Sequence, residues 1–542
     1  MKRVLYTLAC LITAAIMQAQ TVKERIEAIT DKELYLIGEQ MAIKLYATDN
    51  TGKSVNLSRV AYVELNGDEE NNLRLKVEMT NGQGQAVVKL PYTLPTGTYR
   101  LTAYTRWMRN EGEKVFFNKC IGIFNSLRHY PETDRAILTD QPQHGAPTLS
   151  GNKGNLTVKT DKETYASRQD VTLSIEGMAP DAQATIAVVR MDGLDTSGQA
   201  AIALPKEMRA PESCLPELNG MIVEGIFNPH GNADATPVEP NLSVQGKQIN
   251  YYAGKTDLQG RLTFNTPILK GMTEIVTSVR QGGHVTLASP FVATTPSKLQ
   301  PLTVSTFRQQ ALAERSIALQ ATEHYYGPAQ TQTEYNIKGY LTELEPHKRY
   351  DLDMYRRFDT FEETFMEFMP GVSTKGTRGS KHFVVFDALN EVSDAKLNTL
   401  VLLDGVAVMD HELILAYDPH MVKYVETYLG DFSFGNQVYN GILFLKTPNL
   451  KLSGFDLPRT SVICEYEGVH PQTEMYLPSA TEDTPAHMPD LRHTLYWNPN
   501  VTAKNSRLTF RTSDMHGTYI VKVEGRTENG EKLTGYASFQ VK

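Results

Sequence analysis

The chain carries the sequence TDKELY at residues 30–35 and a near copy, TDKETY, at residues 160–165. Each copy is followed by apolar residues at alternate positions, such as Met41, Ile43 and Leu45 after the first. Because side chains along a strand alternate between its two faces, this pattern predicts half-buried β-strands. A repeated strand motif predicts an array of β-modules, and such modules more often hold partners and surfaces than perform chemistry.

The first residues have the layout of a secretory signal peptide. Lys2 and Arg3 precede an apolar run over residues 4–17, and a polar region follows. The run is too short to cross a bilayer core of ~30 Å as a helix, and charged residues follow it too closely for a buried N-terminal helix. We expect cleavage after Ala19 and a mature chain with no transmembrane span. Cys10 lies inside the run, so it leaves with the signal peptide.

Composition bounds the remaining choices. The 542 residues give room for several domains, and the formal charge of −8 becomes −10 when the two positive charges of Lys2 and Arg3 are removed. No dense basic cluster is present to bind a phosphate backbone, so we expect no nucleic-acid partner. Cys120, Cys214 and Cys464 are too far apart for a metal knuckle or a redox pair. One long-range disulfide stays open as an alternative, but we favour three free, buried thiols.

The first module, residues 20–127, opens with TDKxxYxxGE (30–39) and closes with GTYxLxAYT (97–105). These stretches resemble the start and finish of a macroglobulin-type (MG2-like) domain, which implies a β-sandwich. The thioester chemistry of the large macroglobulins requires a Cys-Gly-Glu-Gln stretch, and this sequence has none. A linker rich in Pro, Gly, Asn and Gln (128–152) then leads to a second module of the same type, expected at 153–212.

Three stretches organise residues 213–298, namely ELNGMIVEG (217–225), PNLSV (240–244) and TDLQGRLTF (256–264). Their order resembles a carboxypeptidase-regulatory-like β-sandwich. In the last stretch Asp257 is expected to cap a turn and Gly260 to take the left-handed position, with alternate apolar residues facing the core. A connector (299–350) with a short helix near residues 311–326 follows.

The character of the chain changes after residue 350. Four landmarks follow in order, namely an apolar helix ended by Pro370-Gly371-Val372, LLDGV (402–406), DPHMVKYVE (418–426) and FGNQVYNGILFLKT (434–447). Together they make residues 351–450 closely resemble the plug domain of TonB-dependent outer-membrane receptors. The structural landmarks that the resemblance assigns are Pro370, Gly371, Asp404, Gly405, Gly435 and Gly441. We expect Gly441 to have a positive φ or to lie close to a neighbouring element.

The resemblance to a receptor plug stops where its barrel should begin. A receptor barrel of about 22 strands needs several hundred residues, whereas 92 residues follow Leu450. Their turn signals predict a C-terminal β-sandwich (451–542). We therefore expect a plug-like domain that folds as a water-soluble unit with no pore of its own.

No motif in the sequence carries recognisable chemistry. His411 and Glu412 begin like a zinc-protease helix, but Leu415 stands where the second histidine is required, so we interpret the stretch as a solvated bend. Paired carboxylates suit glycoside hydrolysis, but the candidates are typical of a solvated face: Asp351, Asp353, Glu362, Glu363 and Glu367. Trp107 is interpreted as a core or rim residue rather than a sugar platform. We assign no catalytic, cofactor-binding or metal-binding residue and no cofactor.

These observations predict a multidomain, mainly β protein, with tandem macroglobulin-like or Ig-like sandwiches and one α+β plug-like domain. The expected function is that of an exported, non-enzymatic binding or scaffold protein of the Gram-negative envelope. It would lie in the periplasm, at the outer membrane or on the cell surface, with an outer-membrane receptor or transport complex as partner. The alternative is a carbohydrate-active or other envelope enzyme whose site is assembled from distant residues. A third hypothesis makes the C-terminal sandwich a sorting domain for secretion.

The signal-peptide interpretation has a direct test. N-terminal sequencing of the protein isolated from envelopes is expected to begin close to Gln20, because cleavage follows the small residue Ala19, which lies just after the apolar run. An intact Met1, or a lipid attached to Cys10, would contradict it.

Overall fold

The computed structural model describes residues 23–67, 72–127, 136–139, 154–194, 208–231, 237–280, 282–292, 299–305, 308–327, 339–386, 398–485 and 487–542. The expected signal peptide (1–19) lies outside the described residues, as does most of the expected linker (128–152).

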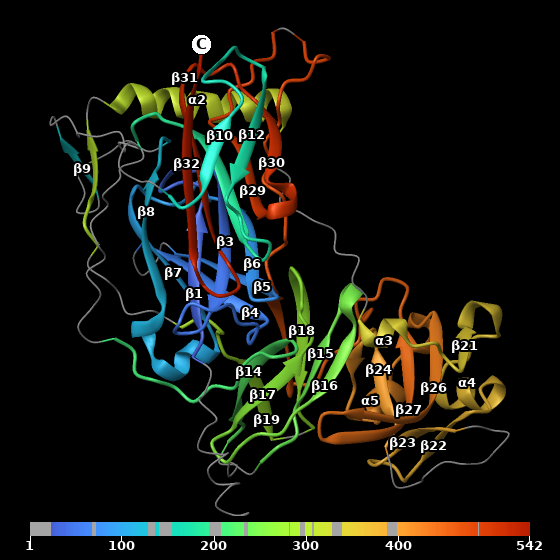
Figure 1. The fold of residues 1–542 in the computed structure, drawn as a ribbon. Helices are drawn as coiled ribbons and strands as arrows, with labels where there is room; N and C mark the ends of the chain where they lie inside the picture. Colours follow the sequence, from blue (N-terminus) through green and yellow to red (C-terminus); the bar gives the residue numbers. More distant parts are fainter. Residues whose placement is uncertain are drawn as a thin grey trace, which may run out of the picture. The chain divides into compact units, whose positions relative to one another are not determined.

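The chain folds into two compact units, each discontinuous in sequence (Figure 1). Unit 1 comprises residues 1–218, 293–333 and 471–542, and unit 2 comprises residues 219–292 and 334–470. Strands dominate both units and pair into several separate sheets, which confirms the expected mainly β class with tandem β-sandwiches. In the described part of the chain, no helix is both long and apolar enough to cross a membrane.

The first β-sandwich of unit 1 uses eight strands in the order β1-β3-β6-β5-β4-β7-β8-β2, with only the edge pair β2 and β8 parallel. Because β5 and β6 pair only beside their connecting turn and β1 contacts β7, the row of strands folds into two layers. The strands are β1 (Arg25–Thr30), β2 (Leu34–Leu36), β3 (Gln40–Thr48), β4 (Val60–Asn66), β5 (Asn72–Thr80), β6 (Gln83–Lys89), β7 (Gly97–Thr105) and β8 (Phe117–Phe124). Trp107 begins the 3₁₀ helix η1 (Trp107–Glu111), which precedes η2 (Glu113–Val115), and is half-buried there.

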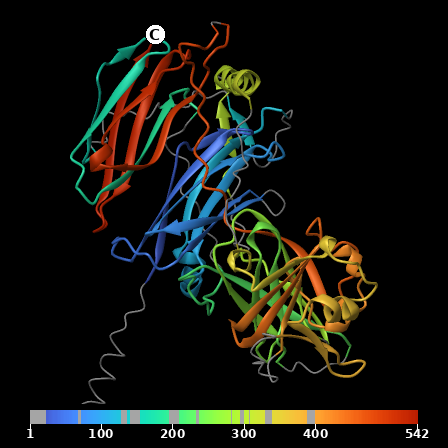
Figure 2. The ribbon, with the colours of Figure 1, turned by 90° about the vertical axis from the view of Figure 1, so that its right-hand side faces the viewer.

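The second β-sandwich of unit 1 is assembled from two distant segments (Figure 2). Its sheets have the orders β10-β12-β30 and β11-β32-β31-β13-β29. The strands are β10 (Thr157–Thr160), β11 (Thr164–Tyr165), β12 (Asp170–Glu176), β13 (Gln183–Arg190), β29 (Thr494–Thr502), β30 (Arg507–Arg511), β31 (Gly517–Arg526) and β32 (Lys532–Val541). The 3₁₀ helix η8 (Ala503–Asn505) joins β29 to β30.

This pairing differs from the expected division into a second module at 153–212 and a separate sandwich at 451–542. Strand β13 pairs with β29 on one side and with β31 on the other, so C-terminal strands flank it on both edges. One core contains apolar side chains from both segments, including Val171, Ile186 and Val521. The physical reason is that a sheet must bury its apolar face against another layer, and neither segment has enough strands to do so alone.

The repeated sequence motif forms the same local structure twice. In the first copy the Tyr35 hydroxyl donates to Asp31 at 2.7 Å and accepts from the Lys32 N–H at 3.0 Å. In the second, Tyr165 makes the same bonds to Asp161 at 2.7 Å and from Lys162 at 2.9 Å. Each aspartate also accepts a backbone N–H from the longer strand after the motif, from Ala42 of β3 in the first copy and Thr172 of β12 in the second. The motif therefore holds a short edge strand, β2 or β11, to the longer strand that follows it, β3 or β12.

Helix α2 (Gln309–Tyr326) occupies the expected connector and is bound to unit 1 by a buried ion-pair network. The Arg315 guanidinium donates to both carboxylate oxygens of Glu39, each at 2.8 Å, and lies 3.2 Å from an oxygen of Asp192. His493 Nε2 lies 2.8 Å from the same Asp192 oxygen. Burial raises the pKa of Glu39, but the charges of Arg315 and Lys32 and the hydrogen bonds from Arg315 together outweigh burial and hold that pKa at about 2. A short parallel pair, β9 (Ala136–Thr139) with β20 (Leu302–Ser305), also belongs to this unit.

Unit 2 begins with a smaller β-sandwich. One sheet has the order β17-β14-β19 and the other β16-β15-β18-β28. The strands are β14 (Met221–Pro229), β15 (Asn241–Val244), β16 (Asn250–Ala253), β17 (Arg261–Thr266), β18 (Met272–Ser278), β19 (Gly283–Leu287) and β28 (Ser461–Glu467). Asp257 caps the turn before β17 and Gly260 has a φ of +75°, as expected. Strand β28 belongs to this sheet, although the sequence suggested the C-terminal sandwich, because it supplies the partner for β18.

The rest of unit 2 is an α/β lobe, which we define as residues 339–386 and 398–457. Its main sheet has the order β21-β26-β27-β24-β25, and β22 pairs with β23. The strands are β21 (Lys348–Asp351), β22 (Val372–Lys375), β23 (His382–Val385), β24 (Leu400–Leu403), β25 (Val406–Ala407), β26 (Tyr424–Phe434) and β27 (Gln437–Lys446). The helices are α3 (Tyr340–Glu343), α4 (Phe361–Phe368) and α5 (His411–Leu415), with 3₁₀ turns η4 (Gly246–Gln248), η6 (Leu352–Met354) and η7 (Pro419–Met421) beside them.

The two faces of strand β24 pack against different parts of unit 2. Leu400 and Leu402 pack with Tyr251 of β16, whereas Val401 and Leu403 pack with Phe365 of α4. The sheet is therefore covered on both faces, which is why this strand is a continuous apolar run paired in parallel with β27.

The repeated motif yields a stability prediction with an internal control. Replacing Tyr35→Phe is expected to lower the free energy of unfolding by about 1–3 kcal/mol, because it leaves a buried carboxylate and a buried N–H without their shared partner. Tyr165→Phe is expected to cost less, about 0.5–1.5 kcal/mol, because Asp161 is exposed and water replaces the lost bond. Urea unfolding of both variants measures the difference. An equal or larger loss for Tyr165→Phe would contradict this account.

Candidate functional site

The six residues assigned by the plug resemblance all lie in the α/β lobe, but they do not form one site. Pro370 and Gly371 follow α4 and lead into β22, Asp404 and Gly405 make the turn between β24 and β25, and Gly435 makes the turn between β26 and β27. Gly441 lies within β27 at a φ of +82°, as expected, beside Val385 and the Tyr428 carbonyl. The glycines are points of close packing: a Cβ at Gly405 would meet Ile249 at 2.8 Å, and one at Gly435 would meet the Ala253 carbonyl at 2.5 Å.

Asp404 has a more specific role, because it holds the loop after β27. Its buried carboxylate accepts the Thr447 N–H at 2.7 Å, the Thr447 hydroxyl at 2.6 Å and the Leu452 N–H at 2.7 Å. In this loop Leu450, Leu452 and Ser453 have φ values of +54°, +58° and +23°. Positive φ strains residues other than glycine, and such strain is concentrated at functional sites. The loop is therefore held by Asp404 in a conformation that it would not adopt alone.

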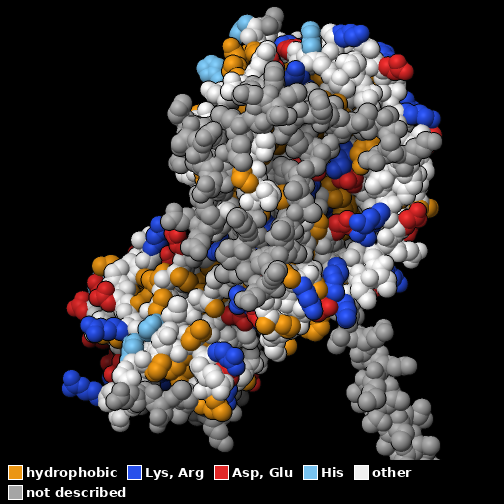
Figure 3. All heavy atoms as spheres, turned by 90° about the vertical axis from the view of Figure 1, so that its left-hand side faces the viewer, with side chains coloured by type: hydrophobic (Ala, Val, Ile, Leu, Met, Phe, Trp, Pro, Cys, Tyr) orange, Lys and Arg blue, Asp and Glu red, His pale blue; other side chains and the backbone are white. Residues whose placement is uncertain are grey.

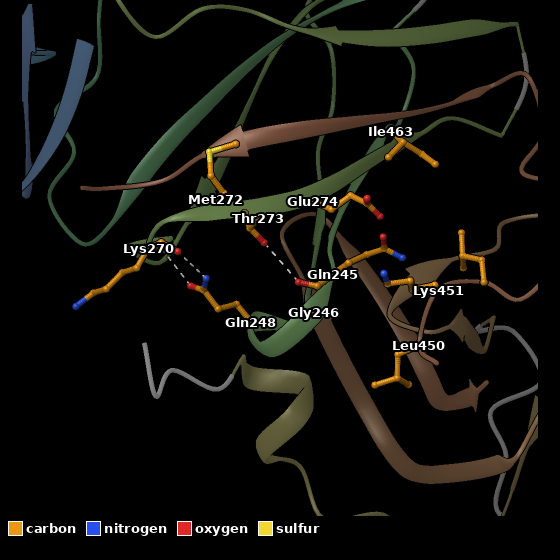
Figure 4. A pocket seen from close by; sticks show the side chains of 11 residues that line it. Gln245, Gly246, Gln248, Lys270, Met272, Thr273, Glu274, Leu450, Lys451 and Ile463 are labelled. Atoms are coloured by element: carbon orange, nitrogen blue, oxygen red, sulfur yellow. Dashed lines mark hydrogen bonds between the residues drawn. The ribbon is translucent and has the colours of Figure 1, made fainter. Parts of the chain in front are cut away.

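The strained loop forms one wall of a hollow of about 520 Å³ within unit 2 (Figure 4). The other walls are η4, with the residue before it, and the start of β18 with the neighbouring β28. The side chains that line the hollow are those of Gln245, Gln248, Lys270, Met272, Thr273, Glu274, Leu450, Lys451, Leu452 and Ile463. The hollow is thus built by residues from four separate segments of the chain.

Gln245 supplies a buried polar group to the wall of this hollow. Its residue is 7% exposed, and its side-chain Nε2 is buried without a hydrogen-bond partner. Figure 4 shows its amide between the side chains of Glu274 and Lys451. A buried N–H without a partner costs about 1–3 kcal/mol, and a ligand oxygen would remove that cost.

The remaining lining is fixed and amphipathic. The Gln248 amide bonds the backbone of Lys270 in both directions, at 3.0 and 3.2 Å, which braces η4 against the start of β18. Met272, Ile463 and Leu450 are 64%, 50% and 45% exposed. Apolar surface beside one acidic and two basic side chains suits a ligand with an aliphatic part and both hydrogen-bond donors and acceptors.

Two other interpretations from the sequence are tested by the structure. His411 is not in a solvated bend: Asp410 caps α5, the half-buried His411 begins that helix, and its Nδ1 accepts the Phe383 N–H at 3.1 Å. Burial lowers the pKa of His411 to about 4. Glu363 and Glu367 lie on the exposed face of α4, as expected, and Glu362 pairs with Lys381.

The cysteines and the surface charge also bear on chemistry. Cys120, Cys214 and Cys464 are thiols outside any disulfide; Cys214 is buried as expected, whereas Cys120 and Cys464 are half-buried. Burial raises the pKa of Cys120 and of Cys464. Among the described residues, no group of three or more His, Cys, Asp or Glu side chains is arranged to hold a metal. On the face drawn in Figure 3, described basic and acidic side chains are interspersed rather than gathered by sign.

Comparison with known proteins gives distant likeness only. No protein-family model matches the chain, and no curated protein matches it. A mutant of Salmonella alpha-2-macroglobulin aligns at 9% identity and a TM-score of 0.24, over 96% of this chain and 39% of its own. Trypsin-activated alpha-2-macroglobulin from Escherichia coli aligns at 7% identity and 0.24, over 96% and 41%.

The Escherichia coli adhesin FdeC aligns at 14% identity and a TM-score of 0.16, over 48% of this chain and 62% of its own. The chain spans less than half the length of the macroglobulins that it matches. At these scores the comparisons carry no argument about function.

Gly441 gives a test of how the lobe is packed. Gly441→Val is expected to lower the free energy of unfolding of unit 2 by about 1–3 kcal/mol, because it combines a strained φ with crowding against Val385. Gly430→Val is the control: its φ is +110°, but nothing lies within 4 Å of a Cβ there, so it tests the backbone alone. Calorimetric transitions of the full chain report both variants. An unchanged transition for Gly441→Val would contradict the close packing of Gly441 against Val385.

Proposed function

We propose that this chain is an exported, non-enzymatic binding or scaffold protein of the Gram-negative envelope, and that the hollow of unit 2 receives an extended segment of a protein partner. The observation that carries the proposal is a preformed hollow whose wall contains the buried Nε2 of Gln245, an N–H donor without a hydrogen-bond partner. A backbone carbonyl of a peptide accepts from that amide, while its side chains reach the apolar rim.

The lining favours a polypeptide over a sugar. Its exposed apolar members are methionine, leucine and isoleucine, whereas a sugar ring is typically bound against an aromatic face. Glu274 and Lys451 carry opposite charges, so an extended segment with a donor and an acidic group is complementary to both. This preference places the carbohydrate-active alternative second.

The finer identity of the modules belongs to the same proposal. Residues 351–450 would be a plug-like domain, and residues 213–298 a carboxypeptidase-regulatory-like sandwich. The expected partner is then an outer-membrane receptor or transport complex, met in the periplasm or at the outer membrane.

Site-specific photocrosslinking tests the proposal. A photoreactive amino acid at Ile463, on the rim of the hollow, is expected to capture a discrete protein from native envelopes, whereas the same group at Met354 is not. Met354 is the control because it is 80% exposed and does not line the hollow. Lys451→Glu and Gln245→Met are each expected to reduce the Ile463 adduct about tenfold or more, since each removes a polar group from the wall of the hollow.

Lys348→Glu, at an exposed position of β21 away from the hollow, controls for the change of charge and should leave the adduct unchanged. Equal capture from Ile463 and Met354, or an adduct unaffected by both hollow variants, would refute a polypeptide site. An adduct with envelope polysaccharide instead of protein would favour the carbohydrate alternative.

A further inference from the structure

Two histidines of the smaller sandwich of unit 2 lie side by side, and neither lines the hollow. The antiparallel register of β14 with β19 places Asn228 opposite His284, and the His230 N–H continues the ladder by donating to the Gly282 carbonyl at 2.8 Å. His230 and Asn228 are two residues apart and so share one face. His230 is thus the diagonal neighbour of His284, a separation that long side chains span.

The two imidazoles meet through their ring nitrogens. His230 Nε2 lies 3.2 Å from His284 Nδ1, and the ring centroids are 5.4 Å apart at an interplanar angle of 43°. Both rings are accessible: His230 is exposed and His284 is half-buried. In the absence of a ligand, one nitrogen donates its proton to the other, so the pair has a single shared N–H.

This spacing matches that of two ligands on one metal ion. With metal–nitrogen distances of ~2.0–2.1 Å, two nitrogens 3.2 Å apart subtend roughly 100° at the metal, close to the tetrahedral value. Imidazole nitrogens suit zinc, copper and nickel, and the near-tetrahedral angle favours zinc over metals that prefer square-planar geometry.

We propose that His230 and His284 form a two-ligand site for a divalent zinc-type cation. His230 binds through Nε2 and His284 through Nδ1, and the ring that donated the shared proton moves it to its other nitrogen, so both imidazoles remain neutral and no proton is lost. No third His, Cys, Asp or Glu of the described residues completes the set. Two coordination positions are therefore left for water or for side chains of a bound partner.

Titration of the full mature chain with zinc chloride tests the site. Calorimetry is expected to show one zinc ion bound per chain, with the affinity reduced about tenfold or more by His230→Gln and by His284→Gln, because either variant leaves a single ligand. His347→Gln is the control, since His347 is an exposed histidine of the same unit outside the pair. Substituted copper should show two nitrogen ligands in its electron paramagnetic resonance spectrum, and one in each single variant.

Each other outcome would overturn the proposal. These are an absence of zinc binding in the unaltered chain, unchanged binding in both histidine variants, or an equal loss in His347→Gln. Circular dichroism of the variants excludes unfolding as the cause of a loss, and the exposed position of the pair makes unfolding an unexpected result.

Discussion

The buried guanidinium of Arg315 is the interaction on which unit 1 depends. It comes from helix α2, Glu39 comes from the first sandwich, and Asp192 and His493 come from the two segments of the second. Removing one member of such a network leaves an uncompensated buried charge, which costs about 3–5 kcal/mol. Because the pKa of Glu39 is held at about 2, its contribution to stability is complete above its usual pKa of 4.5 and declines as the pH falls toward 2. The network therefore joins four distant stretches of the chain at neutral pH.

Contacts between distant stretches of chain, such as this network, also decide which parts of the fold could be predicted from the sequence. Helix α4 could be predicted, because Thr360 caps it and Pro370 follows its end. The positive φ of Gly441 and the turn at Asp257 were also predictable, since each depends on a residue type with a restricted or unusual backbone. The pairing of β13 with β29 and β31 could not be predicted from the sequence. Alternating apolar residues show that a strand has a buried face, but they do not identify its partner 300 residues away.

The hollow of unit 2 could not be predicted from the sequence either, because its residues come from distant parts of the chain. Gln245, Glu274 and Lys451 are ordinary surface residue types, and only the fold brings them together. A partial signal was present in Asp404, which the plug resemblance marked as a turn residue and which proves to hold the wall of the hollow. The strain in the loop left no trace in the sequence, because Leu450 and Leu452 are not residues that favour positive φ.

The strain and its restraint together account for a hollow that is formed before a ligand arrives. Three residues of positive φ cost about 1–3 kcal/mol each, and the three bonds to the Asp404 carboxylate, at about 1.5–3 kcal/mol each, are of a size to offset that cost. A further restraint comes from Tyr417, whose hydroxyl donates to the Ser453 carbonyl at 2.8 Å. A loop held in this way does not have to be ordered by the ligand, so the entropy cost of binding is reduced. The Gln245 side chain, whose Nε2 is buried without a hydrogen-bond partner, belongs to the wall of the space that this restraint keeps open, so the proposed ligand would meet a wall that is already in place.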